Sequence, residues 1–163
     1  MPFVPFHDKF PELGHQEMRS LTLLQDTDVP AGQYGLIEMY CDEPACDCRR
    51  VFFSVLSVEK TQIVAVISYG WESPQFYTNW MGIDDPEVIR ELKGPSLTIS
   101  SPQSPLAPAI LTLVETLVLQ DQRYIERLKT HYALFRETVD KEASTRRGRQ
   151  QRKSRDRRKR RRS

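Results

Sequence analysis

Apolar residues recur at two different spacings along this chain, and the change of spacing divides the body of the protein. Before residue 70, four segments have the alternating or continuous apolar character of strands, at residues 18–25, 35–40, 49–58 and 61–69. Such runs, rich in Val, Ile and Phe, are typical of β-structure. Turns or one short loop separate neighbouring segments, so we predict an antiparallel meander. Apolar residues on both faces of 51–58 and 63–67 predict strands covered at least partly on both sides.

After residue 70 the spacing becomes helical. Residues 84–94 combine an acidic cap, an early Pro and a closing Gly, which predicts a short helix; another begins near Ser73, and 97–99 adds a small strand. A longer helix carries the apolar stripe Ile110, Leu113, Val114, Leu117 and Val118. From Asp121 a last helix buries Tyr124, Leu128, Tyr132, Phe135 and Val139 and exposes Glu126, Lys129, Arg136 and Glu137. We predict an α+β fold with C-terminal helices packed on the meander sheet.

Charge divides the chain into an acidic body and a basic tail. Twelve of the 24 Lys and Arg residues but one of the 22 Asp and Glu residues lie in 146–163, a net charge of +11, which leaves 1–145 at −9. The tail has no hydrophobic residue to bury, so we predict one α+β domain over 1–145 and a disordered tail over 146–163.

The charge density of the tail is typical of arms that follow nucleic-acid phosphates, and arginine-rich segments commonly order on RNA. The alternatives are a solvated charge run or a tail that folds back onto the acidic body. We expect RNA or DNA to bind without sequence preference through the basic side chains of the tail: Arg146, Arg147, Arg149, Arg152, Lys153, Arg155, Arg157, Arg158, Lys159, Arg160, Arg161 and Arg162.

All three cysteines, Cys41, Cys46 and Cys48, lie within eight residues between two predicted strands. The insert 42–45 turns the chain, and an extended Cys46-Asp47-Cys48 places both sulfurs on one side, so three thiolates can surround one ion. We predict a zinc site resembling a zinc knuckle. An odd number of cysteines cannot close fully into disulfides. The alternatives are three reduced cysteines packed as small apolar side chains, an iron–sulfur cluster or a redox switch.

Tetrahedral zinc takes four ligands, which leaves the histidines as candidates for the fourth. His15 precedes the first strand of the meander and is the predicted fourth ligand, because it can fold over the cysteine loop. The alternative is a surface histidine. His131 lies beside the apolar stripe of the last helix, where we expect a packed or capping residue; the alternative is a metal ligand.

The run Tyr40-Cys41-x-x-Pro44-x-Cys46-Asp47-Cys48-Arg49-Arg50-Val51, followed by Arg127-Leu128-x-x-His131-Tyr132-x-x-Phe135, resembles uncharacterised bacterial α+β proteins associated with a SEC-C motif, a small zinc-binding cysteine and histidine element. The resemblance covers most of residues 35–140. This chain has no cysteine or histidine after Phe135, so the SEC-C element itself is absent. The resemblance implies a bacterial source and a metal site only at the three cysteines of the internal loop.

Two classes of function remain. One is a zinc-binding adaptor module with a nucleic-acid arm. The alternative is a zinc-dependent enzyme with an open coordination position for water, although the Pro-Cys-x-x-Cys pair of zinc deaminases is missing. Without an apolar run near the roughly 18 residues of a membrane span, or the regions of a secretory signal, we expect no membrane association and a cytoplasmic location. A protein partner is a further expectation if an aromatic cluster is exposed rather than completing the core: Trp71, Phe76, Tyr77 and Trp80.

Overall fold

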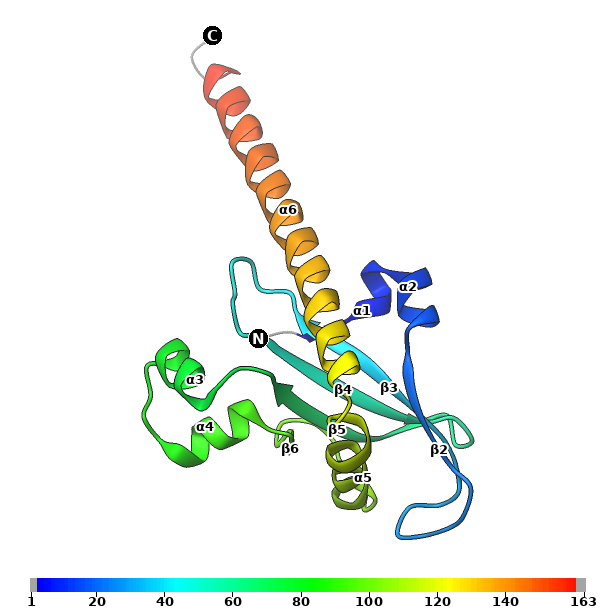
Figure 1. Cartoon of the computed structure of the whole chain (residues 1–163). Coiled ribbons are helices and arrows are strands. Elements are labelled where there is room, and N and C mark those ends of the chain that lie inside the picture. Colours follow the sequence, from blue (N-terminus) through cyan, green and yellow to red (C-terminus); the bar gives the residue numbers. More distant parts are fainter. Residues whose placement is uncertain (1–2, 161–163) are drawn as a thin grey trace.

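The computed structural model describes residues 3–160 and is built around one six-stranded sheet (Figure 1). The predicted meander is confirmed. Its four strands follow one another as antiparallel neighbours: β2 (Arg19–Leu23), β3 (Gly32–Cys41), β4 (Arg50–Ser57) and β5 (Gln62–Gly70). Two short strands extend the sheet, β1 (Phe3–Pro5) beside the end of β3 and β6 (Ser96–Leu97) beside β5.

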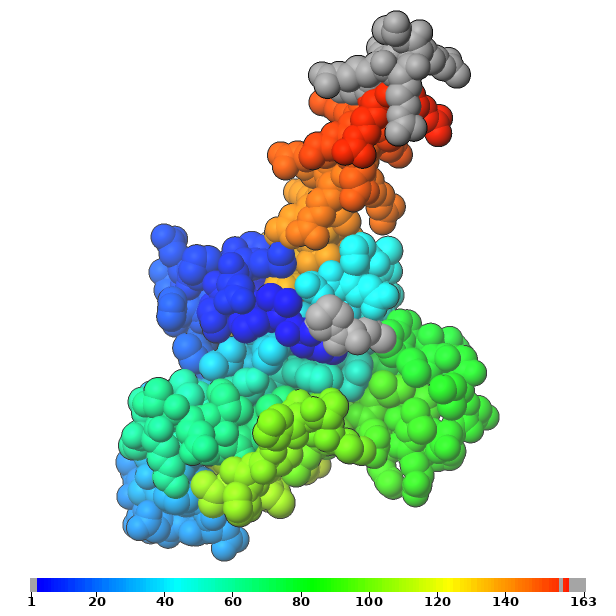
Figure 2. Space-filling view, turned by 180° about the vertical axis from the view of Figure 1, so that it is seen from behind, coloured from blue at the N-terminus to red at the C-terminus, as the bar shows by residue number. Residues whose placement is uncertain are grey.

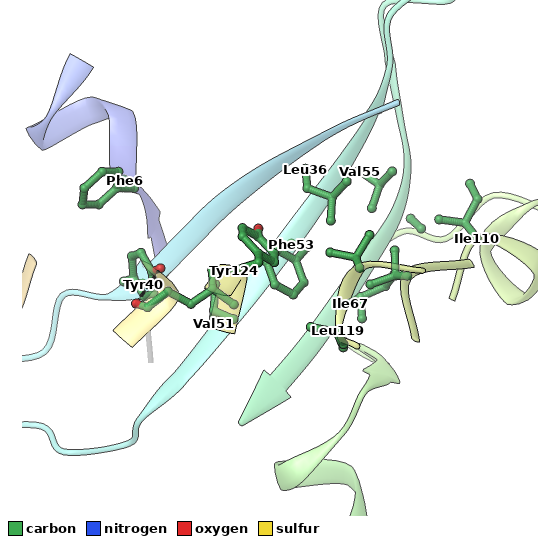
Figure 3. Close-up of a cluster of buried hydrophobic side chains, with 14 of the residues drawn as sticks. Phe6, Leu36, Tyr40, Val51, Phe53, Val55, Ile67, Ile110, Leu119 and Tyr124 are labelled. Atoms are coloured by element: carbon green, nitrogen blue, oxygen red, sulfur yellow. Dashed lines mark hydrogen bonds between the residues drawn. The ribbon is translucent and has the colours of Figure 1, made fainter. Parts of the chain in front are cut away.

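Strand alternation decides which residues of the sheet enter the core. In β4, Val51, Phe53 and Val55 are fully buried, whereas Phe52 between them is half-buried on the opposite face. Figure 3 shows the inward residues meeting Leu36 and Tyr40 of β3, with Tyr124 lying against them. The outer face is covered only in part, by chain near residue 100 that lies across it (Figure 2).

Helical segments from the C-terminal part of the chain cover the inner face of the sheet. The predicted stripe is divided between α5 (Ala107–Leu113) and a π-helical turn, η1 (Val114–Val118). The Leu119 amide donates to the Val114 carbonyl five residues earlier, at 2.9 Å. This wider turn rotates the following positions, so Ile110, Val114 and Val118 are buried but Leu117 is 54% exposed. The prediction that Leu117 belongs to the buried stripe is therefore wrong.

The last helix, α6 (Gln122–Arg160), is 39 residues long and begins at a side-chain cap. Asp121 Oδ1 accepts the backbone amides of Arg123 and Tyr124, at 3.1 and 3.3 Å. Beyond Ala143 every side chain that the structure describes is exposed, and the helix projects away from the body (Figures 1 and 2). The expected disorder over 146–160 is not what the structure shows. Arg, Lys and Gln are good helix formers, and they continue a helix already nucleated by its packed first half.

Short helices join the remaining parts, and their caps follow the sequence signals. Ser73 caps α3 (Pro74–Met81) and Asp85 caps α4 (Pro86–Lys93), each through a side-chain oxygen that accepts a helix amide. The N-terminal elements α1 (Phe6–Lys9) and α2 (Pro11–Gln16) were not predicted, because one or two turns carry no periodic signal. Within residues 3–160, no helix combines the length and apolar character required to cross a membrane.

Candidate metal centre

The three cysteine sulfurs lie close together in the loop region that joins β3 to β4. Cys41 is the last residue of β3, while Cys46 and Cys48 lie in the connecting loop. Their Sγ atoms are all within 4.8 Å of one another. Sulfurs bonded at 2.3 Å to one tetrahedral zinc would lie about 3.8 Å apart, so a small closure of the loop suffices to bind the ion. Cys41 and Cys48 are fully buried, Cys46 is half-buried, and no disulfide joins the three.

The loop is held in shape by two residues in left-handed backbone conformations. Ala45 has φ 60° and Arg49 has φ 47°, values that non-glycine residues rarely adopt. Hydrogen bonds secure both. The Ala45 amide donates to Asp140 Oδ1 at 2.9 Å, the Arg49 amide donates to the Tyr132 hydroxyl at 3.2 Å, and the Tyr77 hydroxyl donates to the Arg49 carbonyl at 2.9 Å. Side chains of α3 and α6 thus fix where the sulfurs point.

Arg136 of α6 ties the loop to the helix. Its Nη1 donates to the Cys41 carbonyl at 2.6 Å and its Nη2 to the Glu43 carbonyl at 2.7 Å. We predicted an exposed Arg136, and this prediction is wrong, because the side chain is 8% exposed. The signal was present in the sequence: Arg136 follows Tyr132 by four residues and precedes Val139 by three, which places it on the packed face of the helix.

The thiols are electrostatically unequal before any metal binds. The pKa of Cys41 is lowered to about 6, chiefly by the hydrogen bond from the Cys48 side chain and with help from the positive charge of Arg136. The same hydrogen bond, together with burial, raises the pKa of Cys48, and burial raises the pKa of Cys46. At neutral pH the loop therefore holds one thiolate and two thiols, and a metal that binds all three sulfurs displaces about two protons.

The structure does not bring His15 to the cysteines. Among residues 3–160, the group of potential ligand atoms at this site contains the three sulfurs and no histidine nitrogen. The exposed His15 instead lies beside His7, with their ring centroids 6.2 Å apart. The alternative interpretation, a surface histidine, therefore describes its position. Helix α2 turns this side chain outward because its packed residue is Leu13.

His131 is packed, as expected, but its partners were not predicted. Its Nδ1 lies 2.7 Å from Glu38 Oε2 and its Nε2 lies 2.6 Å from Glu17 Oε2, with the ring stacked on Phe6 at 4.2 Å. Glu38 also accepts the Tyr40 hydroxyl at 2.9 Å. Burial would lower the pKa of His131, but the hydrogen bonds and charges of Glu38 and Glu17 outweigh it and raise the pKa.

The alternation of inward and outward residues in β3 could have identified Glu38 as a buried residue. Residues 34, 36 and 40 of β3 face the core, so residue 38 faces it too. A buried carboxylate needs partners, and His131 is the histidine that lies in an apolar stripe. The sequence thus indicated a buried Glu38 on β3 and a packed His131 on α6, but it did not indicate that these two elements contact each other.

The aromatic residues that follow β5 do not form an exposed patch. Tyr77 is fully buried, and Trp71, Phe76 and Trp80 are half-buried against the body. The Trp71 ring meets Tyr132 edge to face at 5.2 Å. Trp71 and Trp80 thus pack against the hydrophobic core, and Tyr77 supports the cysteine loop through its hydrogen bond to the Arg49 carbonyl.

The predicted nucleic-acid-binding residues lie on the projecting part of α6. Those with described side chains are all exposed: Arg146, Arg147, Arg149, Arg152, Lys153, Arg155, Arg157 and Arg158. Lys159 and Arg160 belong to the same helix. Arg161 and Arg162 lie outside the described residues.

Comparison with protein-family models, with curated proteins and with solved structures finds no match to this chain. The resemblance to SEC-C-associated proteins therefore stays a prediction, and the site has to be interpreted from its own geometry.

Proposed function

We propose that this chain is a zinc-binding adaptor module whose arginine-rich helix binds RNA or DNA without base specificity. The observation that supports it most is the set of three cysteine sulfurs within 4.8 Å of one another, in a loop tied to α6. Soft thiolates at this spacing favour zinc among the common divalent ions. The proposed location is the cytoplasm, where thiols stay reduced and open to metal.

Metal analysis tests the first half of the proposal. The full chain, produced with added zinc, should contain about one equivalent, because thiolate binding is coupled to the fold of the loop. Cys46→Ser should lose most of the metal and melt at a lower temperature, while His15→Gln, a matched change away from the cysteines, should keep it. Well under roughly half an equivalent of any metal in the wild-type protein would reject the zinc site.

The second half of the proposal depends on the charge and length of the arm. At 1.5 Å per residue, the 15 residues 146–160 of α6 are about 22 Å long, enough to lie along roughly six phosphates of one strand. Because the helix projects from the body, the acidic domain is held away from most of these arginines (Figure 1). That arrangement weakens the intramolecular competition that net charge alone would predict.

Binding to a mixed-sequence oligonucleotide across a salt series tests the arm. Affinity should fall by on the order of a thousandfold between roughly 50 and 200 mM salt if six phosphates are engaged. A variant of the full chain with Arg146, Arg147, Arg149, Arg152, Lys153 and Arg155 replaced by Gln should lose most of the affinity and of the salt dependence. The control replaces exposed cations of the body, Lys60, Arg90 and Arg123, and should bind like the wild type. Equal affinities of wild type and arm variant would remove nucleic acid as a partner.

One observation favours the second candidate, a zinc-dependent enzyme. Within residues 3–160 the cluster of potential ligand atoms consists of three sulfurs, so a zinc held by these alone would keep one position for water, which it would acidify. Cobalt substitution distinguishes the two functions, because its absorption spectrum reports the coordination. A spectrum that responds to azide or to pH near neutrality would favour the enzyme, and an unresponsive one the adaptor.

A further inference from the structure

A pocket on the outer side of the sheet contains the largely buried Arg50, the residue that follows the cysteine loop, but its lining includes none of the three cysteines and no residue of the basic arm. It has a volume of about 330 Å³ and is bounded by β4, β5, α4 and the segment from β6 to Ser100. The walls combine apolar side chains, among them Val88, Leu92 and Leu97, with the hydroxyls of Ser68, Ser96, Thr98 and Ser100. In Figure 2 the segment after β6 (yellow-green) borders the block formed by α3 and α4 (green). The volume is at the lower end of the range for pockets that hold small molecules.

Arg50 lies in this pocket without a carboxylate partner among the described residues; burial lowers its pKa, and the charges of Cys48 and Cys41 offset this only in part. The side chain is only 9% exposed, yet no carboxylate of the described residues lies within ion-pair distance of it. Its Nε donates to the Leu92 carbonyl at 2.8 Å and its guanidinium carbon lies 5.2 Å from the centre of the Phe52 ring. The other guanidinium nitrogens have no hydrogen bond to any residue in the described part of the chain. Neither Nη atom is among the fully buried side-chain atoms that lack a partner, so both reach the solvent of the pocket and present N–H donors to it.

The hydroxyls of Ser68, Ser96 and Thr98 beside Arg50 are held by hydrogen bonds within the protein, and Ser96 Oγ also donates to the Glu91 carbonyl at 2.9 Å, so Arg50 supplies the side-chain donors for an anion. Ser68 and Ser96 share a hydrogen bond of 3.0 Å between their Oγ atoms, and Thr98 Oγ1 donates to the Val66 carbonyl at 3.0 Å. Ser100 lies at the exposed rim. Glu91 is the acidic residue that lines the pocket, and its side chain is exposed, so water screens its charge. The interior is therefore positive at Arg50, polar beside it and apolar along Leu92 and Leu97.

We propose that this pocket binds a small anionic ligand, with a carboxylate or phosphate group on the guanidinium of Arg50 and an apolar portion against Leu92 and Leu97. A planar guanidinium pairs with either oxyanion through two parallel hydrogen bonds, and such charge-assisted bonds are the strong ones. The ligand would supply acceptors for the Arg50 Nη groups, which no described residue of the chain engages.

Site-resolved NMR on the full, zinc-supplemented chain tests the proposal, with inorganic phosphate and butyrate titrated separately at constant ionic strength. The Arg50 Nε–H signal and the amides of Thr98 and Ser100 should shift and saturate with at least one of the two anions. Phosphate binding alone would indicate a phosphorylated ligand, and butyrate binding alone a carboxylic acid. Arg50→Gln should weaken binding by about tenfold or more. The control Arg90→Gln removes an exposed arginine from α4 and should leave the affinity unchanged.

A second variant keeps the test decisive if Arg50→Gln does not fold. Val88→Trp places a large side chain at the half-buried wall formed by α4 and leaves Arg50 intact, so it should abolish the saturable shifts. Binding that is equal in wild type and Val88→Trp would overturn the proposal. Shifts in the wild type that do not saturate, or that are confined to residues 146–160, would overturn it as well, since they would report ion binding to the arm.

Discussion

At the scale of single residues, the most consequential feature is a buried carboxylate with three partners. Glu38 is 7% exposed and is contacted by His131, Tyr40 and Tyr124, which come from β3 itself and from α6. Glu17 completes the arrangement from the N-terminal side by pairing with the other nitrogen of His131. The network joins three parts of the chain that the meander alone would leave apart.

This network predicts a specific dependence of stability on pH. Because the pKa of His131 is higher in the folded protein than its ordinary value of 6.5, the ion pairs stabilise fully below pH 6.5 and this contribution is lost as pH rises through the folded pKa. The free energy of unfolding should therefore decrease above pH 6.5. His131→Gln should lower stability by about 3 kcal/mol and remove that decrease.

Denaturant unfolding followed at a series of pH values from 6 to 9 measures this effect. His15→Gln is the matched control, since it removes an exposed histidine and should keep the wild-type profile. If His131→Gln showed the same decrease with pH as the wild type, another group would be responsible.

At the scale of elements, β4 shows how one strand serves two environments. Phe53 is fully buried beside Tyr124, with ring centroids 6.3 Å apart, whereas Phe52 stacks on Phe3 at the half-covered outer face. Neighbouring residues of the same type thus differ only in the face of the sheet that they occupy.

Substituting each of the two phenylalanines tests this assignment. Phe53→Asp should unfold the body, because an unpaired buried charge costs several kcal/mol, on the order of the whole stability of such a domain. Phe52→Asp should fold, since its carboxylate reaches water and lies near Arg50. Cooperative thermal melting of both variants checks the pair, and a soluble Phe53→Asp protein with a wild-type melt would contradict the burial of that face.

The loop between β3 and β4 is an element whose shape depends on α6. Arg136→Met removes both hydrogen bonds to the carbonyls of Cys41 and Glu43 while keeping the apolar part of the side chain. We expect zinc affinity to fall by roughly tenfold or more, as when other outer partners of metal ligands are lost. Competition with a coloured chelator measures the affinity. Arg123→Met, at an exposed position of the same helix, is the control, and equal affinities in the two variants would show that Arg136 does not support the site.

At the scale of the whole molecule, one helix belongs to two regions. The first part of α6 packs on the sheet through Tyr124, Leu128 and Phe135, whereas the described side chains beyond Ala143 are all exposed. The ion pair between Lys9 and Glu142, at 2.9 Å, lies near the end of the packed region.

Truncation to residues 1–145 should therefore leave the melting temperature within about 2 °C of the full chain, because less than 1 kcal/mol of stabilising contacts is removed. The far-ultraviolet circular dichroism should lose helical signal, since residues 146–160 are helical in the full chain. A melting temperature lower by more than roughly 5 °C would mean that the arm packs against the body.

The sequence by itself determined the local features of this protein. Spacing and turn chemistry over a few residues decide the order of the meander strands and the position of the cysteine loop between two of them. The same local signals decide where α3, α4 and α6 begin and which residues of β3 face the core. The proximity of three cysteines in the chain also made their proximity in space a sound prediction.

Only the tertiary structure decided which distant residues meet. Glu38 and His131 are 93 residues apart, Arg136 reaches the cysteine loop from another element, and Arg50 is enclosed by α4 and the segment after β6. Burial of a polar group depends on such remote partners, which periodicity does not reveal. The same reason explains the arm. Composition alone predicts disorder for a segment without apolar residues, whereas a helix nucleated by packing continues through residues that would not start one.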